Sequence, residues 1–422
     1  MKLKPKIIVF SQVYPFPLVS GQNQRVANTL IGLKSKGFHI TFFTFGKSQE
    51  IQSIKDKLLE YCDDSIVLRS IYNRNIIRKW FHKISGMFYT LLTGKKFSNY
   101  IIEKVEFSFS RVSRNLPKRK FDFALFEYWH SYNLIPLMKK ENIPCIIDIH
   151  NILWRNWEFY LTLKTKFPNR WEPILPNFIK DRLVMKYKKN ELSAYSNYDC
   201  LITLGSEEID YLMENGIEKN KLFRMPMGIS LKKWEYVWSY NNVNKKIVYY
   251  GGLSNPYNLK DVLFLYNYFM PIIWSKFKNA ELWLVGSNPS KEVQALTDNS
   301  KVIVTGFVDD INDVLKDKDL MVMPWSGASG FRSRLIEVMA LGLPVLTTKT
   351  LVKQMDIREH AKFILADNNQ GLSKLALKML NNKEIMKNQS LSGRKFVEQL
   401  YSFEATYGAL PYHLLSKIKR GI

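Results

Sequence analysis

The chain has 422 residues, of which 46% are hydrophobic and 14% aromatic, and its formal net charge is +24. This composition is that of a folded protein long enough for two domains, and it excludes a disordered or collagen-like chain. No apolar run reaches the roughly 18 residues that a membrane-spanning helix needs, so we expect no transmembrane segment.

The first half of the chain alternates short apolar strands with helical stretches. Lys6–Phe10 is predicted as a strand, because this apolar run is too short for a leader peptide. A loop over 11–22 leads to a predicted helix over 23–36, which Gly37 ends. Further strands are predicted over 39–44, 144–148 and 200–203. This alternation favours a doubly wound parallel sheet.

The same alternation restarts after about residue 230. It follows 225–228, a turn-forming stretch that could act as a hinge. Strands are predicted over 247–250, 282–285, 302–305, 320–323 and 345–347, with helices over 259–268 and 332–341. We therefore predict an α/β protein with two Rossmann-like domains.

The three cysteines are Cys62, Cys145 and Cys200, and they are widely scattered. They form neither a CxxC pair nor a metal-ligand pattern, which favours a reducing compartment. We therefore expect the protein in the cytoplasm.

The positive charge is concentrated in one block. Between Arg69 and Lys120, 13 basic residues are opposed only by Glu103 and Glu106. Such a block attracts anionic lipid, phosphorylated substrates or nucleic acid, although a Lys-rich solvated face would explain it too. No RNP, KH or helix-turn-helix pattern accompanies it, so we expect no nucleic-acid partner.

Part of this block mixes basic, aromatic and aliphatic residues, as a segment lying on a membrane surface does. A core helix with a basic outer face would explain the aromatic residues equally well. The residues expected to contact the acceptor or an anionic membrane surface here are Arg78, Lys79, Trp80 and Lys83.

Two loops are candidates for ligand binding, since ligands of open α/β sheets bind where strands lead into helices. The first loop, 12–22, holds Gly21 ahead of a helix, which would let a phosphate approach backbone amides.

In the second loop, two glycines precede a predicted helix that begins with Arg332 and Arg334. Cations are disfavoured at a helix N-terminus unless an anion lies there, so these arginines favour a ligand that carries more than one negative charge. An ordinary salt bridge between Arg334 and Glu337 is the plainer interpretation of that carboxylate.

The segment 324–345 resembles the signature of the family-4 (glycosyl transferases group 1) enzymes, which are retaining glycosyltransferases of the GT-B fold. Its matching positions are Gly330, Arg332, Glu337, Ala340, Gly342, Pro344 and Val345, with Arg334 where Lys is usual. Supporting likenesses, in chain order, lie at 14–25, 148–151, 203–229, 250–258, 284–286 and 305–308. The resemblance thus covers roughly residues 6–400.

The resemblance implies a role for each matching residue. Glu337 would hold the ribose hydroxyls, and Arg332 and Arg334 would hold the diphosphate as the glycosidic bond breaks. His150 would face the sugar from the other domain, and His130 could line the acceptor cleft. The remaining donor-binding residues would be Gly21, Gly252, Gly306, Phe307, Val308, Ser329, Gly330 and Phe331. No metal or other cofactor is expected, because the arginines and the helix end neutralise the leaving group.

Three positions depart from the family pattern. Ser329 replaces the first Glu of the E-x7-E motif, Gly252 stands where Arg is frequent, and Tyr257 where Lys is frequent. Sub-branches with a GxGxRxK loop share these losses, so we interpret the chain as such a branch. A non-catalytic GT-B partner subunit and a GT-B sugar-nucleotide epimerase remain alternatives.

The expected organisation is a GT-B fold, with two Rossmann-like domains facing across a cleft. Residues 1–228 would form the acceptor domain, 229–400 the donor domain, and 401–422 a helical segment returning to the first domain. The expected function is retaining transfer of a sugar, hexosyl in type, from a nucleotide-diphosphate (UDP or GDP) sugar to a glycan or lipid-linked acceptor. Bacterial-type surface polysaccharide or glycoconjugate synthesis is the expected setting, at the inner face of the membrane.

Overall fold

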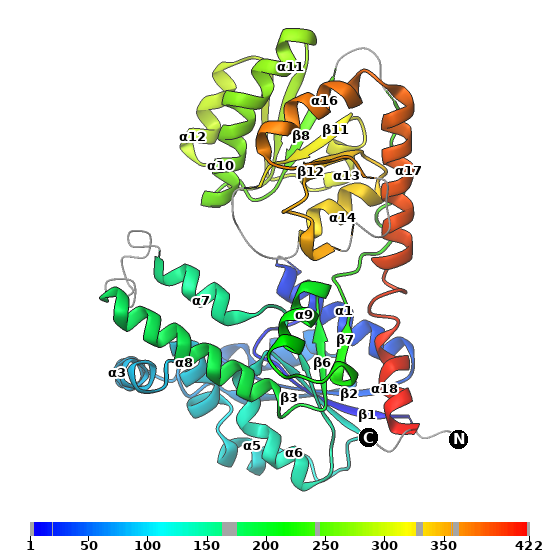
Figure 1. Cartoon of the computed structure of the whole chain (residues 1–422). Helices are drawn as coiled ribbons and strands as arrows, with labels where there is room; N and C mark the ends of the chain where they lie inside the picture. The colour runs from blue at the N-terminus through cyan, green and yellow to red at the C-terminus, as the bar shows by residue number, and fades with distance from the viewer. Residues whose placement is uncertain are drawn as a thin grey trace. The chain divides into compact units, whose positions relative to one another are not determined.

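The structure is a computed structural model that describes residues 4–18, 20–162, 175–240, 245–325, 332–355, 357 and 363–419 (Figure 1). The chain divides into two compact units. Unit 1 consists of Met1–Leu204, Glu208–Pro226 and Tyr407–Ile422, and unit 2 consists of Gly205–Glu207 and Met227–Thr406.

Unit 1 is built on a parallel sheet whose described strands follow the order β3-β2-β1-β4-β5-β6-β7. On β1, Ile7 lies opposite Ile40 of β2 on one side and opposite Phe123 of β4 on the other. Helices cover both faces of such a sheet, so its central strands are continuously apolar. The strands are β1 Lys6–Phe10, β2 His39–Gly46, β3 Asp64–Arg69, β4 Phe123–Glu127, β5 Cys145–Asp148, β6 Cys200–Thr203 and β7 Leu222–Arg224.

The helices of unit 1 connect these strands. The α-helices are α1 Gly21–Ser35, α2 Ile51–Leu58, α3 Ile76–Thr93, α4 Phe97–Tyr100, α5 Phe109–Asn115, α6 Ile135–Lys140, α7 Leu153–Thr162, α8 Asn177–Tyr195, α9 Ser206–Glu214 and α18 Leu410–Lys419. A π-helical segment, η2 (Ile101–Glu106), follows α4, and a 3-10 segment, η3 (Trp129–Leu134), follows β4. Helix α1 begins two residues before the predicted start, because the Ser20 side chain caps it by accepting from the Asn23 amide.

Unit 2 repeats the same architecture, with the described strands in the order β10-β9-β8-β11-β12-β13. The strands are β8 Lys246–Tyr250, β9 Glu281–Val285, β10 Val302–Gly306, β11 Leu320–Met323, β12 Val345–Thr348 and β13 Leu365–Ala366. Its α-helices are α10 Pro256–Phe264, α11 Met270–Lys276, α12 Lys291–Gln294, α13 Ile311–Leu315, α14 Ser333–Ala340, α16 Leu372–Leu380 and α17 Lys383–Leu400. A π-helical segment, η6 (Leu265–Phe269), joins α10 to α11.

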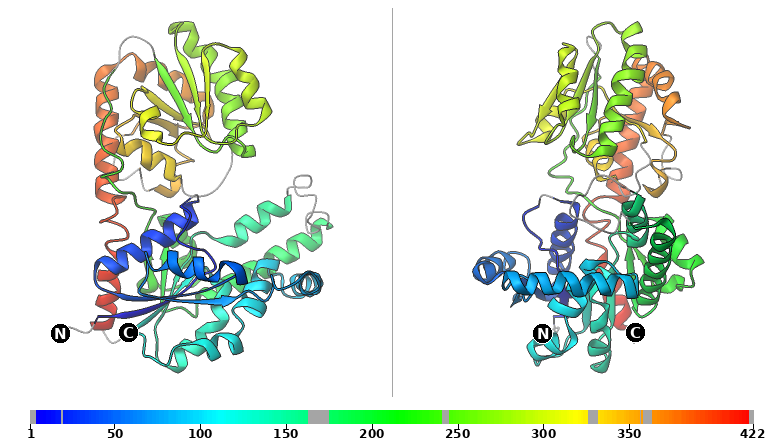
Figure 2. Two further views of the ribbon diagram at one scale, coloured as in Figure 1. Left: turned by 180° about the vertical axis from the view of Figure 1, so that it is seen from behind. Right: turned by 90° about the vertical axis from the view of Figure 1, so that its left-hand side faces the viewer.

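The end of the chain returns to unit 1. Helix α18 lies beside α1, as the views of Figure 2 also show. His413 stacks on Phe223 of β7 with ring centroids 4.1 Å apart, and Lys417 Nζ donates to the Asn220 carbonyl at 3.0 Å. The C-terminal residues therefore complete the fold of the unit in which the chain starts.

In both sheets the strand order reverses beside the first strand of the unit. The reversal lies between β1 and β4 in unit 1 and between β8 and β11 in unit 2. Ligands of doubly wound sheets bind outside the carboxyl ends of the strands at such a point. The fold therefore gives each unit one expected binding region.

Candidate active site

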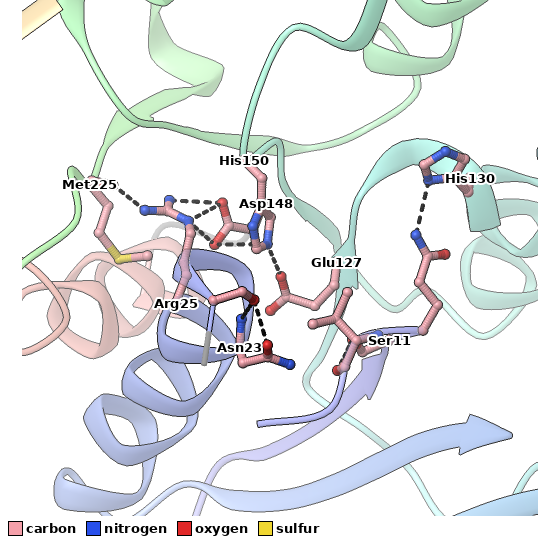
Figure 3. Close-up of polar contacts among 11 residues, drawn as sticks. Ser11, Asn23, Arg25, Glu127, His130, Asp148, His150 and Met225 are labelled. Atoms are coloured by element: carbon pink, nitrogen blue, oxygen red, sulfur yellow. Dashed lines mark hydrogen bonds and ion pairs between the residues drawn. The ribbon is translucent and has the colours of Figure 1, made fainter. Parts of the chain in front are cut away.

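In unit 1, a buried ion pair lies at the carboxyl end of the sheet. Arg25 of α1 donates to both carboxylate oxygens of Asp148, at the end of β5, over 2.8–2.9 Å (Figure 3). A third guanidinium nitrogen donates to the Met225 carbonyl at 2.9 Å. Burial lowers the pKa of Arg25, but the charge and hydrogen bonds of Asp148 raise it by more, so the guanidinium stays charged. The pair fixes α1 against β5.

Beside this pair, His150 is held in a constrained position. Its Nε2 lies 2.5 Å from Oε2 of Glu127, the last residue of β4, and its ring stacks on Tyr128 with centroids 4.3 Å apart. Both His150 and Tyr128 have positive backbone φ angles, 56° and 69°, which residues other than glycine rarely adopt. Such local strain is typical of functional sites.

Glu127 keeps acceptor capacity within this cluster. Burial raises the pKa of its carboxyl group, while the His150 hydrogen bond opposes that shift. Its other oxygen, Oε1, has no hydrogen-bond partner among the described residues. A buried acceptor of this kind suits a hydroxyl group of a ligand.

Glu127, Asp148 and His150 also have the geometry of a metal-ligand set, since one ligand atom of each lies within 4.8 Å of the others. The guanidinium of Arg25 already occupies both oxygens of Asp148. A second positive charge there would meet repulsion. The arrangement therefore suits a hydrogen-bonded charge network better than a metal ion.

His130 and Gly21 lie near the same end of the unit 1 sheet. The Nδ1 atom of His130, in η3, is 3.2 Å from the side-chain nitrogen of Gln12, in the loop after β1. Burial, helped by the charge of Lys96, lowers the pKa of His130 to about 3, so its imidazole is neutral. Gly21 is exposed and is the first residue of α1.

In unit 2, Arg334 and Glu337 meet at the start of α14, the helix that follows β11. Arg334 Nη1 donates to the two Glu337 oxygens at 3.2 and 2.9 Å and to the Tyr250 hydroxyl at 2.5 Å. The guanidinium also lies 4.6 Å from the centre of the Tyr250 ring, at the end of β8. The ordinary salt bridge between Arg334 and Glu337 is thus present. It lies at the point where the strand order of the sheet reverses.

This arrangement suits a nucleoside diphosphate. The Glu337 side chain is 7% exposed, and a carboxylate has about four lone-pair sites, so one cation does not exhaust it. The Arg334 side chain is 44% exposed, which leaves its guanidinium accessible. Glu337 could therefore accept from ribose hydroxyls while Arg334 contacts phosphate oxygens.

The other predicted donor-site residues lie around these strands. Arg332 is the N-cap residue of α14. Gly252 follows β8, and a Cβ atom at this position would have no neighbouring atom within 4 Å. Gly306 ends β10 with a φ of 68°, and the neighbouring Phe307 is 75% exposed. Val308 is half-buried beside it. Ser329, Gly330 and Phe331 lie outside the described residues.

The predicted acceptor or membrane residues lie on α3. Arg78, Trp80 and Lys83 are exposed, whereas Lys79 is half-buried. The apolar side chains of α3 are exposed too, led by Ile76 at 84%. Within unit 1, therefore, α3 is not a core helix with a basic outer face, which was the alternative explanation of its aromatic residues.

Some of the residues that complete these sites were not predicted from the sequence. Glu127 and Tyr250 each lie at the last position of a strand beside a reversal point. No motif marks Glu127, and Tyr250 was noted only as the start of the likeness at 250–258. Recognising β4 would have pointed to Glu127, because its carboxyl end adjoins that of β5. Arg25 and Asp148 were noted only as parts of the family likeness.

A comparison with known protein families finds a match within unit 2. Residues 244–382 match the family described as glycosyl transferases group 1. The sequence has no significant match among curated proteins.

Solved structures resemble the chain over nearly its whole length. Sucrose-phosphate synthase from Thermosynechococcus elongatus has a TM-score of 0.63 at 16% identity, covering 99% of this chain and 100% of that one. Anabaena HepE, in complex with UDP and glucose, has a TM-score of 0.57 at 11% identity, covering 98% and 99%. WaaG, a glycosyltransferase involved in lipopolysaccharide biosynthesis, has a TM-score of 0.57 at 13% identity, covering 99% and 100%.

At such identities the likeness concerns the fold, and it confirms the GT-B prediction. Residues 244–382 thus match the glycosyl transferases group 1 family, and the whole chain has the GT-B fold.

Proposed function

We propose that the protein transfers a sugar, hexosyl in type, from a nucleotide-diphosphate sugar to a glycan or lipid-linked acceptor. The observation that carries this proposal is the Arg334–Glu337 pair at the reversal point of a group 1 domain. When the bond between sugar and diphosphate breaks, negative charge develops on the leaving diphosphate. A guanidinium preplaced at the start of a helix stabilises that charge.

The donor and the stereochemistry are part of the proposal. UDP and GDP sugars are the donors we propose, and the UDP and glucose bound to HepE support the first. Retention of configuration follows the family resemblance. We further propose that transfer needs no metal, because Arg332 and Arg334 supply positive charge to the diphosphate.

The unit 1 cluster would act on the transferred sugar. We propose that His150 and the unpartnered oxygen of Glu127 hydrogen-bond its hydroxyl groups. Surface polysaccharide or glycoconjugate synthesis of the bacterial type is the proposed setting, and the role of WaaG in lipopolysaccharide biosynthesis supports it.

Isothermal titration of UDP and GDP tests the nucleotide site. Arg334→Ala and Glu337→Ala should each weaken the preferred nucleotide by about 1.5–3 kcal/mol, the range for a hydrogen bond to a charged group. Lys316→Ala is a matched control, because Lys316 forms an exposed i,i+3 pair with Asp313 in the same unit. Wild-type affinity in both site variants would contradict the assignment.

The anomeric proton signal of the product tests the stereochemistry. An α-linked donor should give an α-linked product, and a β-linked product would overturn retention. Chelator-treated enzyme should keep its activity if transfer is metal-free.

We also propose that unit 1 docks on an anionic membrane surface through α3, at the cytoplasmic face. None of the helices in the described ranges has both the length and the apolar character to cross a bilayer. Helix α3 instead exposes a long apolar surface: Ile76, Ile77, Trp80, Phe81, Ile84, Phe88, Leu91 and Leu92. Its only buried residues are Gly86 and Thr90, so its apolar side chains are the ones left facing outward.

The charges around α3 suit anionic lipid. Arg74, Arg78 and Lys83 are exposed on or just before this helix. Elsewhere in the basic block, Lys95 and Arg111 form ion pairs with Glu103 and Glu106. The cations available for lipid are therefore fewer than the sequence count indicates, and several of them lie at α3.

Co-sedimentation with vesicles of anionic phospholipid tests the docking. Arg78→Glu, Lys79→Glu and Lys83→Glu together should abolish binding at low salt, since each basic residue near an anionic surface contributes about 1 kcal/mol. Lys118→Glu with Lys120→Glu is the matched control, because these exposed residues lie in the same block but outside α3. A wild-type protein that ignores anionic vesicles at low salt would overturn the docking proposal and leave the transferase proposal intact.

A further inference from the structure

A cavity of about 370 Å³ lies in unit 2, among residues that follow three neighbouring strands. Strands β11, β12 and β13 are adjacent in the sheet, and the cavity lies among the residues at and beyond their carboxyl ends. Its volume is at the lower end of the range for small-molecule sites. The lining residues are Trp325, Thr348, Thr350, Asp367, Asn368, Asn369 and Gln370.

The backbone of an aromatic residue, Trp325, is fixed at this cavity. The Trp325 amide donates to Asn369 Oδ1 at 2.8 Å, and Asn369 Nδ2 donates back to the Trp325 carbonyl at 3.0 Å. These two bonds hold the backbone of Trp325 against the start of η9 (Asn369–Gly371). The residue nevertheless remains 40% exposed. The backbone of a large aromatic residue is thus held by polar contacts at the cavity, and the residue is left partly open to solvent.

The rest of the lining consists of hydroxyl, amide and carboxylate groups. None of the described lining residues is a cation. The carboxylate of Asp367 is paired with Lys349 at 2.5 Å, and Asn368 Oδ1 accepts from the Gly371 amide at 3.2 Å. A phosphate would find no cation among the described lining residues, and Lys349 is already paired with Asp367, so this lining does not suit the nucleotide diphosphate. Hydroxyl groups, by contrast, would find both donors and acceptors.

We propose that this cavity binds a neutral pyranose ring, with one face against Trp325 and its hydroxyl groups bonded to Asp367, Asn368 and Gln370. A sugar ring combines an apolar face with a polar edge, which matches an aromatic side chain surrounded by short polar groups. The argument that the ring binds here does not depend on the nucleotide contacts proposed for Arg334 and Glu337. Only the origin of the ring, donor sugar or acceptor glycan, rests on the proposed function.

The test uses saturation-transfer NMR and calorimetry on the full chain. The probes are the methyl glycosides of glucose, galactose, mannose and N-acetylglucosamine, their β1-4 and α1-4 disaccharides, UDP and GDP, and the UDP and GDP sugars. Trp325→Ala should weaken the bound sugar by about tenfold, the scale for losing a stacked aromatic contact and its buried area. Gln370→Ala should weaken it as well. Tyr268→Ala is the control, because Tyr268 is an exposed aromatic residue of the same unit outside the cavity.

The pattern across probes identifies the source of the sugar. If the ring belongs to the donor, Trp325→Ala weakens a nucleotide sugar but leaves the free nucleotide unchanged. If it belongs to the acceptor, the free glycoside or disaccharide is weakened and the nucleotide sugar is not. The proposal is overturned if no probe loses affinity in Trp325→Ala, or if Tyr268→Ala has the same effect. Failure of the nucleotide site would appear separately, as wild-type UDP and GDP affinity in Arg334→Ala.

Discussion

A single arginine organises the buried charges at the carboxyl end of the unit 1 sheet. Arg25 neutralises Asp148, and Glu127 is the carboxylate closer to His150, at 2.5 Å against 4.0 Å for Asp148 (Figure 3). Removing one member of a buried pair leaves an uncompensated charge, which typically costs about 3–5 kcal/mol. The Arg25–Asp148 pair therefore supports the geometry of His150, although neither of its members needs to contact a ligand.

His130 should make the stability of the protein sensitive to acid. The folded protein keeps this imidazole neutral down to a pKa of about 3, whereas the unfolded chain protonates it near its ordinary pKa of about 6.5. The contribution of His130 to the unfolding free energy is therefore complete above pH 6.5. It is lost as the pH falls toward 3, at up to about 1.4 kcal/mol per pH unit. His130→Asn should flatten the pH dependence of the unfolding free energy in this window. Urea titrations at intervals from pH 7 to pH 4.5 measure it, and parallel curves for the two proteins would refute the assignment.

At the level of residues, the sequence predicted only the sites that a motif marks. Arg334 and Glu337 are three positions apart, so a helical pattern is enough to bring them together. Tyr250 reaches the same site from 84 positions away, because β8 and β11 are neighbours in the sheet. Such a contact depends on strand order, which local periodicity does not contain.

Helix α3 reverses the usual arrangement of a surface helix. Its buried residues are Gly86 and Thr90, and its exposed side carries large apolar side chains together with basic ones, whereas helices of water-soluble domains normally bury the apolar stripe. Asn75 caps the helix by accepting from the Arg78 amide at 2.8 Å, and Gly94 ends it with a φ of 77°. The helix is thus well defined, and its apolar surface remains available to a partner.

Gly86 should be required for the packing of α3. A Cβ atom at this position would lie 2.3 Å from a ring carbon of Phe97, at the start of α4. Gly86→Ala should lower stability by about 1–3 kcal/mol through overpacking, less the roughly 1 kcal/mol that alanine gains in helix propensity. Phe97→Leu in the same chain should recover part of the loss. Thermal unfolding measures both effects, and Lys83→Ala is the control on the exposed side of α3. An unchanged melting temperature for Gly86→Ala would contradict this packing.

The strands were predicted well where both faces are buried. The predicted ranges of β1, β6 and β11 match the structure, because each is a short run of buried apolar residues between turns. Other elements were missed for identifiable reasons. Strand β3 begins with the polar pair Asp64 and Ser65, and β13 is only two residues long. In these cases neighbouring strands rather than local pattern decide the conformation.

The whole molecule uses one architecture twice. Both sheets have their first strand flanked by the second and the fourth, so one rule of ligand placement applies to each unit. The sequence predicted this organisation because alternating strands and helices leave few topologies open. The sequence could not predict which residues lie together at the ligand-binding edge of each sheet, because those residues come from strands that are distant in the chain.

The return of the chain to unit 1 depends on a close backbone approach that glycine allows. A Cβ atom on Gly32, in the buried face of α1, would lie 2.5 Å from the Tyr407 carbonyl oxygen. Because backbone rather than a flexible side chain stands there, Gly32→Ala should push the segment from Tyr407 to α18 away from α1. We expect a loss of about 1–3 kcal/mol in unfolding free energy and faster proteolysis after Tyr407.

Limited proteolysis followed by mass spectrometry locates the cleavage, and thermal unfolding measures the loss of stability. Ile31→Ala is the matched control, because Ile31 is the neighbouring residue of α1 and is 43% exposed. If Gly32→Ala keeps the wild-type cleavage pattern and melting temperature, then α18 is not held by this contact. The stacking of His413 on Phe223 would then be the contact that retains the segment, and Phe223→Ala should release it instead.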